Sequence, residues 1–377
     1  MLVEVRHDEM ARQTFASALK SHLSSHVSPG TRQAFHDRVA PAFKRAEGRP
    51  IATRHEVRRA ISKDPVYQVA SSLKRTAQEV MFDSVGECVE RQLDDLVDRA
   101  RRFHNRGGTV RTDPNLEIPR YHTAVDIHCM PGGYHSELRE DDVYAGALYD
   151  RSIYLFSMGL RGDLNDDFGR SLATWTRTTY PDFAPKRILD MGCSVGHGTL
   201  PWTDVYPEAE VHAFDAGAPM VRYGQARAAA LGKNVHFSQQ NAEATDYPDE
   251  SFDLVISQII IHETSSKALP RIFKECHRLL KPGGLMLHMD GHPWADDKPY
   301  DAFVSDWDTY YNNEPFIGAM HDSDLPGMAV KAGFARDKVI DTTAKSIGRD
   351  TRNKGRKELQ AGDFGNIGAF WVFGAWK

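Results

Sequence analysis

Cysteine is scarce in this sequence. Its 377 residues include only Cys88, Cys129, Cys193 and Cys276, and no two of them form a Cys-x-x-Cys pair. This spacing excludes a disulfide scaffold and a zinc ribbon. It is typical of a protein from a reducing compartment, so we expect a cytoplasmic location.

Long hydrophobic runs are also missing. The longest apolar stretch, residues 254–261, is interrupted by Ser257 and Gln258, whereas a membrane span needs about 20 apolar residues. The first residues, Met1 to Glu9, contain no apolar core of a secretory signal. We therefore expect no membrane partner.

Neither sign of charge dominates the chain, which has 47 Lys and Arg against 52 Asp and Glu and a net charge of −5. Residues 1–120 hold 21 basic against 16 acidic residues, a net +5, and residues 121–377 hold 26 against 36, a net −10. Proteins that grip phosphate backbones usually carry a clear basic excess. We therefore expect no nucleic-acid partner.

The length predicts more than one domain, because a single core stops growing near about 250–300 residues. Residues 1–104 are predicted to form a helical domain: Asp64-Pro65 is a typical helix start, and apolar residues follow at three- and four-residue steps. Such helices allow a homodimer. Residues 105–160, which begin with glycines and prolines, are predicted to be a linker and a pocket-covering segment, and residues 161–377 an α/β domain.

Short apolar runs recur from residue 187 onward and alternate with helical segments. This alternation predicts a mostly parallel sheet with helices on both faces. The seven predicted strands are residues 187–191, 210–214, 235–237, 252–258, 284–289, 338–343 and 369–376.

The first of these strands ends in an acid and a glycine turn, Asp190-Met-Gly192-Cys-Ser194-Val-Gly196-His-Gly198. In open parallel sheets, ligands bind at the carboxyl ends of the strands, and glycines there let the backbone approach the ligand. A dinucleotide loop needs a third glycine after Gly-x-Gly, but here Thr-Leu-Pro follows. The chain also lacks the Gly-x-x-x-x-Gly-Lys loop of nucleoside triphosphate sites.

The arrangement Asp-x-Gly-x-x-x-Gly-x-Gly instead resembles motif I of the class I S-adenosylmethionine-dependent methyltransferases, small-molecule and ubiquinone-biosynthesis-like members among them. The resemblance covers residues 185–290 well and does not cover 1–140. It implies that residues 161–377 adopt a Rossmann-like, seven-stranded methyltransferase fold with S-adenosyl-L-methionine as cofactor.

The resemblance also implies roles for single residues. Asp215 ends the second strand where a carboxylate binds the ribose, and Met220 matches a residue that packs on adenine. Asn241-Ala242-Glu243 resembles the family's Asp-Ala-Glu beside the adenine amino group, with Asn241 as a departure. The predicted cofactor-binding residues are Asp190, Gly192, Cys193, Ser194, Gly196, Gly198, Asp215, Met220, Asn241, Ala242, Glu243 and Gln258.

A candidate base follows the fourth strand. His262 matches the histidine that acts as general base in many small-molecule O-methyltransferases, and Glu263 matches the acid beside it. A neutral hydroxyl must lose a proton on methylation, so a base with a pKa near 7 helps. A substrate-lining or structural role for His262 is the alternative interpretation.

Histidines gather before the α/β domain, at His122, His128 and His135 beside Cys129, and this grouping raises the question of a metal site. Their spacing matches neither a helix-borne nor a finger pattern, so we expect no metal. The segment 121–136 is interpreted instead as a loop over the pocket.

Five residues are predicted to bind the substrate. Three lie in the pocket-covering loop, and the others follow the fifth strand, as does Asp290, where acceptor-binding residues often lie in the family. The five are Tyr121, Tyr134, His135, His292 and Trp307. The loop from Lys345 to Lys357 carries six Lys and Arg, which indicates a solvated hairpin loop or a lid for an anionic substrate.

These residues predict an enzyme that methylates a small molecule, at oxygen with His262 as base. Three alternatives stay open: N-methylation of a small molecule, methylation of RNA or protein, and a non-catalytic cofactor-binding subunit. No Asn-Pro-Pro-Tyr sequence follows the fourth strand, which argues against methylation of an extruded base.

Overall fold

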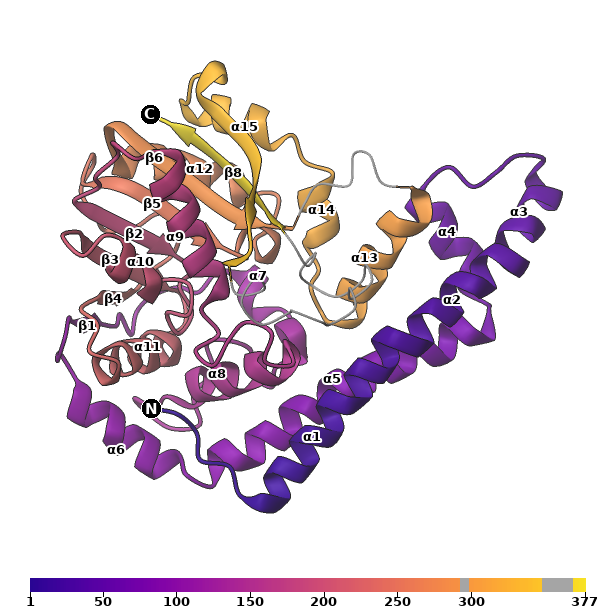
Figure 1. The fold of residues 1–377 in the computed structure, drawn as a ribbon, viewed down its shortest axis with the longest axis horizontal. Helices are drawn as coiled ribbons and strands as arrows, with labels where there is room; N and C mark the ends of the chain where they lie inside the picture. The colour runs from indigo at the N-terminus through magenta and orange to yellow at the C-terminus, as the bar shows by residue number, and fades with distance from the viewer. Residues whose placement is uncertain (292–297, 348–368) are drawn as a thin grey trace.

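A computed structural model describes residues 1–291, 298–347 and 369–377 of the chain (Figure 1). His292 and the basic residues Arg349 to Lys357 lie outside this part. The described residues form an eight-stranded sheet in the order β1-β4-β3-β2-β5-β6-β8-β7. Its strands are β1 (Val110–Arg111), β2 (Arg187–Met191), β3 (Glu210–Asp215), β4 (His236–Gln239), β5 (Phe252–Gln258), β6 (Leu280–Asp290), β7 (Val339–Lys345) and β8 (Ala369–Trp376).

The sheet is mostly parallel, as predicted. Strands β1 to β6 pair in parallel, and β8 runs antiparallel to both β6 and β7. This is the Rossmann-like class I methyltransferase architecture, and the seven predicted strands all appear in it. Its carboxyl-terminal edge therefore brings together the ends of β2, β3 and β5.

The eighth strand, β1, corrects the prediction that residues 105–120 are only a linker. Val110 pairs with Phe237 at the edge of the sheet. The close approach depends on Gly108, whose φ is +114° and where a Cβ atom would lie 1.9 Å from the Val235 carbonyl oxygen. Two residues carry no periodicity, so no sequence pattern could reveal this strand.

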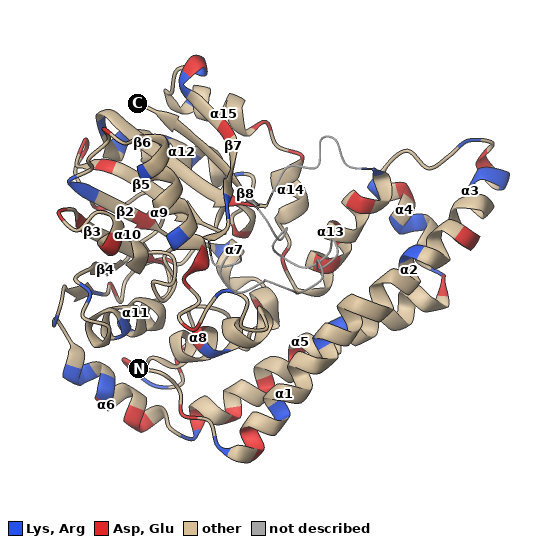
Figure 2. Ribbon diagram, viewed as in Figure 1, with Lys and Arg blue, Asp and Glu red and all other residues tan. Residues whose placement is uncertain are grey.

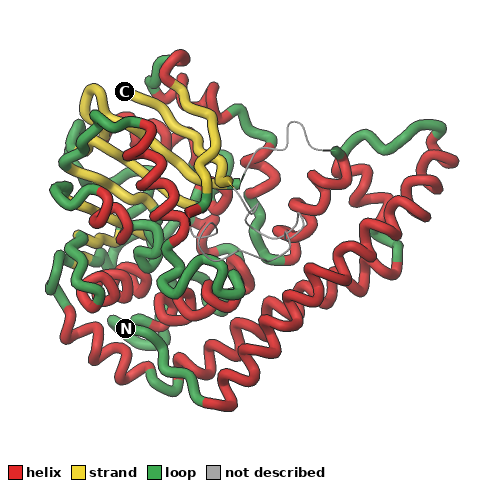
Figure 3. The backbone as a smooth tube through the Cα atoms, in the orientation of Figure 1, coloured by secondary structure: helices red, strands yellow, loops and turns green. Residues whose placement is uncertain are grey.

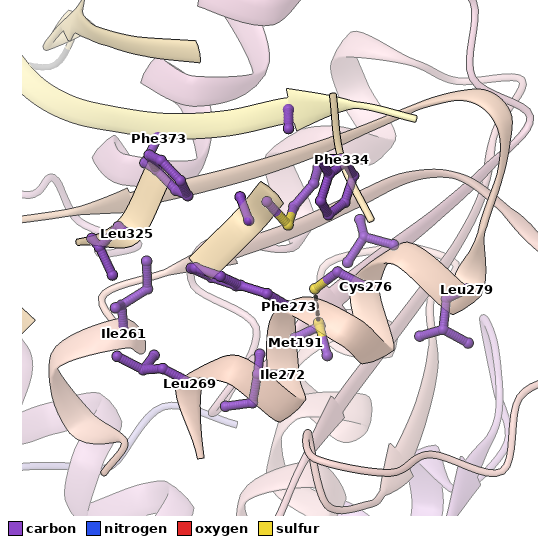
Figure 4. Close-up of a cluster of buried hydrophobic side chains, with 14 of the residues drawn as sticks. Met191, Ile261, Leu269, Ile272, Phe273, Cys276, Leu279, Leu325, Phe334 and Phe373 are labelled. Atoms are coloured by element: carbon purple, nitrogen blue, oxygen red, sulfur yellow. Dashed lines mark hydrogen bonds between the residues drawn. The ribbon is translucent and has the colours of Figure 1, made fainter. Parts of the chain in front are cut away.

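Two hydrophobic cores cover the two faces of the sheet. Alternate residues of a strand point to opposite faces, so Ile188 packs with α9, α10 and α11 while Leu189 packs with α12 and α15. Figure 4 shows the second core, where Phe273, Cys276 and Phe334 meet β6 and β8. The flanking helices are α9 (Asp167–Thr179), α10 (Leu200–Val205), α11 (Ala218–Ala230), α12 (Leu269–Leu279) and α15 (Leu325–Ala332).

Helices occupy most of residues 7–103 (Figure 3). Residues 7–90, here called the helical arm, run out along α1 and return along α5, which begins at Pro65 with Asp64 as N-cap (Figure 1). The elements are α1 (His7–His22), η1 (Leu23–Val27), α2 (Ser28–Ala34), η2 (Phe35–Val39), α3 (Ala40–Glu47), α4 (Arg54–Ile61), α5 (Pro65–Glu90) and α6 (Leu93–Phe103). None of the helices described here is long and apolar enough to cross a membrane.

Short helices connect the arm to the sheet and cover its carboxyl-terminal edge. Before β2 lie α7 (Arg120–Thr123), η3 (Ile127–Cys129) and α8 (Tyr144–Phe156). After β5 and β6 lie η4 (Ile261–Glu263), α13 (Pro299–Tyr311), α14 (Ile317–His321) and η5 (Arg336–Lys338).

The helix α13 packs on the helical arm rather than on the sheet (Figure 1). Tyr67 of α5 and Phe303 and Trp307 of α13 belong to one buried cluster. Basic residues of the arm form ion pairs with acidic residues of the 298–322 segment; Figure 2 colours both kinds along the ribbon. The ion pairs are Arg32–Asp301 at 2.7 Å, Arg54–Asp322 at 2.6 Å, Arg58–Asp306 at 2.6 Å and Lys74–Asp308 at 2.5 Å.

We expect Trp307→Ala to lower the free energy of unfolding by about 3–5 kcal/mol, because it leaves a large cavity between α13 and α5. The Trp307 side chain is 0% exposed, and its indole N–H donates to Ser71 Oγ at 2.9 Å. Urea denaturation measures the effect. The control Tyr310→Ala changes a side chain of the same helix that is 62% exposed, and it should cost less than about 1 kcal/mol. Equal costs would show that Trp307 does not join the two elements.

Candidate active site

A cavity opens at the carboxyl ends of β2, β3 and β5. It encloses about 1060 Å³ of empty space, open solvent at its mouth included. The glycine turn after β2 and Asp215 at the end of β3 form its floor, while Tyr121, His128 and Tyr134 cover it. Pockets of this size and position are typical small-molecule sites in α/β folds.

The glycines of the turn are required by tight packing. Gly192 has a φ of +68°, and a Cβ atom there would lie 2.1 Å from Ile260 Cδ1. A Cβ atom on Gly198 would lie 2.3 Å from Gln258 Oε1. The turn therefore lies against the residues that follow β5, and Gln258 Nε2 donates to the Gly198 carbonyl at 3.1 Å.

Two carboxylates lie in this floor in different surroundings. Asp215 accepts the backbone N–H groups of Ser194 and Gly217, both at 2.9 Å. Burial raises the pKa of Asp215, while these hydrogen bonds favour its charged form. Asp190 accepts only the Thr199 hydroxyl, at 2.6 Å, among the described side chains, and burial raises its pKa to about 7.

A buried network fixes the glycine turn to α8. His197 of the turn donates from Nε2 to Asp150 Oδ1 at 2.5 Å. The Tyr223 hydroxyl donates to the other oxygen of Asp150 at 2.7 Å. Burial opposes ionisation of Asp150, but His197 and Arg227 hold its pKa well below the usual value.

Two residues of the cavity wall, His128 and Glu263, belong to a buried cluster of three carboxylates and two imidazoles, here called the acid–imidazole cluster: His128, His262, Glu263, Asp290 and Glu314. His128 donates from Nε2 to Glu263 Oε1 at 3.0 Å and from Nδ1 to Glu314 Oε1 at 2.9 Å. His262 donates from Nδ1 to Asp290 Oδ1 at 2.5 Å. Its Nε2 lies 3.8 Å from both Glu263 Oε1 and Glu314 Oε2.

The cluster holds its imidazoles in the protonated state. Burial disfavours the charged form of His128, but Glu314 and Glu263 raise its pKa to about 10. Burial likewise opposes protonation of His262, but Asp290 raises its pKa to about 9. A base must be unprotonated to accept a proton, so His262 is poorly suited to that task at neutral pH.

A second cavity of about 470 Å³, open solvent included, lies behind the first, and we call it the rear chamber. The residues His128, Tyr134, Tyr149, Arg161 and Ile259 line both cavities. The rest of the rear chamber comes from two helices, α5 with Gln78, Met81 and Phe82 and α8 with Ser152, Ile153 and Phe156.

Twelve of the residues predicted from the sequence line the first cavity. They come from the glycine turn, the ends of β3 and β5, and the covering loop. They are Tyr121, Tyr134, Asp190, Gly192, Cys193, Ser194, Gly198, Asp215, Asn241, Ala242, Gln258 and Glu263.

Other predicted residues lie elsewhere. Met220 and His262 are 0% exposed and line neither cavity. Gly196 packs under Phe237, where a Cβ atom would lie 3.1 Å from Cζ, and Glu243 pairs with Arg271 at 2.5 Å. Burial and His122 lower the pKa of His135, which also lines neither cavity.

Trp307, which was predicted to bind the substrate, has its side chain buried between α13 and the helical arm and lines neither cavity. Sequence reasoning missed Tyr149, Arg161 and Glu314. It named His128 only as a possible metal ligand, and no group of three or more His, Cys, Asp or Glu among the described residues could hold a metal ion. No motif marks these residues, because they reach the site from separate segments.

Comparison with known proteins identifies a domain. Residues 188–284 match the family described as "Methyltransferase domain". The chain is 27% identical over 177 residues to phosphoethanolamine N-methyltransferase 1 of Zea mays. The match covers 45% of this chain and 33% of the maize protein. It is 28% identical over 177 residues to the ubiquinone/menaquinone biosynthesis C-methyltransferase UbiE of Vibrio campbellii. This match covers 42% of this chain and 68% of UbiE.

Solved structures that match part of the chain include phosphoethanolamine N-methyltransferase 2 of Haemonchus contortus in complex with phosphomonomethylethanolamine and S-adenosylhomocysteine. It has a TM-score of 0.42 and 18% identity, over 64% of this chain and 60% of that one. YcgJ of Bacillus subtilis has a TM-score of 0.39 and 21% identity. The match covers 54% of this chain and 97% of YcgJ. The chain spans one third of the length of the maize relative.

The acid–imidazole cluster predicts a pH-dependent stability. The folded protein keeps protons on His128 and His262 to a higher pH than the unfolded chain, where histidine titrates near about 6.5. The two protonated imidazoles contribute fully to the free energy of unfolding below about pH 6.5, and this contribution is lost as the pH rises toward about 10. We expect the free energy of unfolding to fall by at least about 1.4 kcal/mol, the equivalent of one pKa unit, over this range.

Urea denaturation between about pH 6 and 10 measures this loss. In His128→Gln the decline should be clearly smaller, since one of the two imidazoles is gone. The control His55→Gln removes an exposed imidazole of α4 and should keep the wild-type pH profile. Identical profiles for His128→Gln and the wild type would contradict the coupling.

Proposed function

We propose that this chain, a class I S-adenosylmethionine-dependent methyltransferase by the domain that it carries, transfers a methyl group to a small molecule enclosed beneath residues 119–134. The observation that carries the proposal is the pair of cavities. The first lies at the strand ends, where its floor can hold a nucleoside, and it shares five lining residues with the rear chamber. A donor in the first cavity and an acceptor in the rear chamber can therefore meet at this shared lining.

The residues of the first cavity fit S-adenosylmethionine. The Asp215 carboxylate can accept the ribose hydroxyls, and Asn241 and Ala242 can border the adenine. Gln258 Oε1 is buried and has no hydrogen-bond partner among the described residues, so it can accept from a ligand. Arg161, whose guanidinium lies 4.0 Å over the Phe168 ring, can hold a carboxylate. The bound cofactor supplies an electrophilic methyl group.

Ile259 separates the two cavities and has a strained backbone. Its φ is +60°, which is rare for a β-branched residue. The conformation is held by the hydrogen bond from its N–H to the Met289 carbonyl at 2.8 Å. Such strain, which costs about 1–3 kcal/mol, concentrates at functional sites. Ile259 thus fixes the passage through which the acceptor faces the donor, and this positioning is the main catalytic contribution we assign to the fold.

Glu263, rather than His262, faces the acceptor in this proposal. Glu263 lines the first cavity, and the Tyr134 hydroxyl donates to its Oε1 at 3.4 Å. Burial opposes ionisation of Glu263, but His128 and His262 lower its pKa, so it is a carboxylate at neutral pH. His262 acts as a positioning residue, because it binds Asp290 and lies beside Glu263.

The helical arm gives little support to an RNA substrate. Residues 1–120 carry a net charge of +5, but Arg32, Arg54, Arg58 and Lys74 of the arm pair with aspartates of the 298–322 segment. Side chains in such pairs are less available to an external polyanion. This pairing supports the small-molecule proposal.

The acceptor class can be tested with labelled donor. The protein is incubated with S-adenosylmethionine that carries a tritiated methyl group and with cell extract separated by ultrafiltration. We expect label in the fraction that passes the filter, and Asp215→Ala should abolish it. Label in the retained RNA or protein would overturn the small-molecule proposal.

We expect Asp215→Ala to weaken S-adenosylhomocysteine binding at least tenfold, about 1.4 kcal/mol, because the ribose loses its acceptor. Isothermal titration calorimetry measures the affinity. The control Asp204→Ala, an exposed aspartate of α10, should bind like the wild type. Unchanged affinity in Asp215→Ala would remove the ribose assignment.

We expect Glu263→Gln to lower the transfer of label to the small-molecule fraction by at least about tenfold, the low end of the effect of a positioned acid or base. The affinity for S-adenosylhomocysteine should stay within about twofold, because Glu263 lies at the acceptor end. Glu208→Gln, at an exposed position, is the matched control. A loss of cofactor affinity equal to the loss of transfer would contradict this separation.

A further inference from the structure

We propose that the rear chamber and the acid–imidazole cluster together bind an acceptor that combines a compact apolar body with a basic amine. The inference rests on the proposed function in one respect, since the amine nitrogen is taken as the atom that receives the methyl group. It adds the chemical class of the substrate and the segment of the chain that selects it.

The charge balance of the acid–imidazole cluster favours a cation. Among the described residues it contains three carboxylates, Glu263, Asp290 and Glu314, and two imidazoles, His128 and His262. With both imidazoles protonated, one negative charge remains uncompensated in buried surroundings, which is costly. An ammonium group would neutralise it.

The nearby histidines do not supply this missing charge. Burial lowers the pKa of His288 to about 4 and that of His321 to about 3, so both are neutral. His122 lines the first cavity outside the cluster, and its influence is divided between Asp215 and Glu263.

One unpartnered oxygen of the cluster belongs to a residue of the cavity wall. Glu263 Oε2 and Glu314 Oε2 are buried and have no hydrogen-bond partner among the described residues. Of these two residues only Glu263, which is 7% exposed, lines the first cavity, beside Tyr134 and His128. An ammonium donates up to three hydrogen bonds, whereas an alcohol donates one and a carboxylate donates none. The amine is therefore the group that satisfies Glu263 best.

The rear chamber has the opposite character. Met81, Phe82, Ile153, Phe156 and Ile259 give it an apolar lining. Two cations border it, since Lys20 Nζ lies 4.2 Å from the centre of the Phe156 ring and Arg161 lines one wall. These charges disfavour an ammonium inside the chamber. The acceptor is therefore oriented with its apolar body in the rear chamber and its amine toward Glu263.

Aromatic rings line the path between the two ends. The ring centres of Tyr134 and Tyr149 are 5.7 Å apart, and those of His128 and Tyr134 are 6.3 Å apart. The faces of tyrosine rings attract ammonium groups, and this attraction persists after methylation. The same site can thus hold the amine and its methylated product.

During transfer, the unprotonated amine nitrogen uses its lone pair to form the new C–N bond as the S–C bond of the donor breaks. The sulfur keeps the electron pair of that bond and becomes the neutral thioether of S-adenosylhomocysteine. The proton that the ammonium loses before attack passes to the carboxylate of Glu263 and then to solvent.

The test uses three probes with one skeleton: 2-phenylethylamine, 2-phenylethanol and 3-phenylpropionate. Each is titrated by calorimetry into the full chain saturated with S-adenosylhomocysteine. We expect the amine to bind at least tenfold more tightly than the alcohol or the carboxylate. In Glu263→Gln this preference should fall by at least tenfold.

The position of the apolar body is tested on α5. Met81→Trp fills the rear chamber and should weaken amine binding at least tenfold, while the affinity for S-adenosylhomocysteine stays within twofold. The control Val69→Trp places the same bulk on the same helix at a side chain that is 58% exposed, and it should bind the amine like the wild type.

Either of two outcomes would overturn the inference: equal binding of amine, alcohol and carboxylate, or wild-type amine binding in Met81→Trp. Both leave the proposed function intact, provided that S-adenosylhomocysteine binds. If the wild type fails to bind S-adenosylhomocysteine, the proposed function itself is wrong and the inference falls with it.

Discussion

The bonds of His128 to Glu263 and Glu314 connect three segments that are far apart in the sequence. Glu263 follows β5, Glu314 follows α13, and His128 lies in the loop that covers the cavity. Buried carboxylates are costly unless they are paired, so none of these segments can occupy its place without the others. One imidazole thus couples the closure of the cavity to the fold on both sides of it.

The helical arm helps to position His128 through two sets of contacts. Gln78 of α5 donates to the His128 carbonyl at 2.9 Å, which fixes the backbone of the loop directly. The arm also holds α13 through the Trp307 core and three ion pairs, and α13 leads into Glu314. The arm therefore positions both His128 and the segment that carries Glu314, while the glycine turn is held by the sheet and by the bond of His197 to Asp150 of α8.

The sequence predicted the strand and the glycine turn that line the first cavity because their signals are local. A strand, an acid and a glycine turn lie within a dozen residues, and the geometry of Gly192 requires glycine. The sequence did not indicate Tyr149, Arg161 and Glu314, since they carry no motif and are brought together only by packing. Trp307 shows that local sequence also does not reveal which distant segment buries a residue. Its position after the fifth strand suggested substrate binding, but the helical arm covers it.

Backbone strain occurs both in the glycine turn and around the lining that the two cavities share. In the turn, left-handed conformations occur at Gly192 and Gly196, where they cost little, and at Ser194, whose φ is +45°. Around the shared lining they occur at His128, Cys129 and Ile259, where each costs about 1–3 kcal/mol. The fold maintains this strain because the side chains of His128 and Ile259 line both cavities, and glycine would remove them. These two strained residues therefore lie in the place that the proposed function gives to the acceptor.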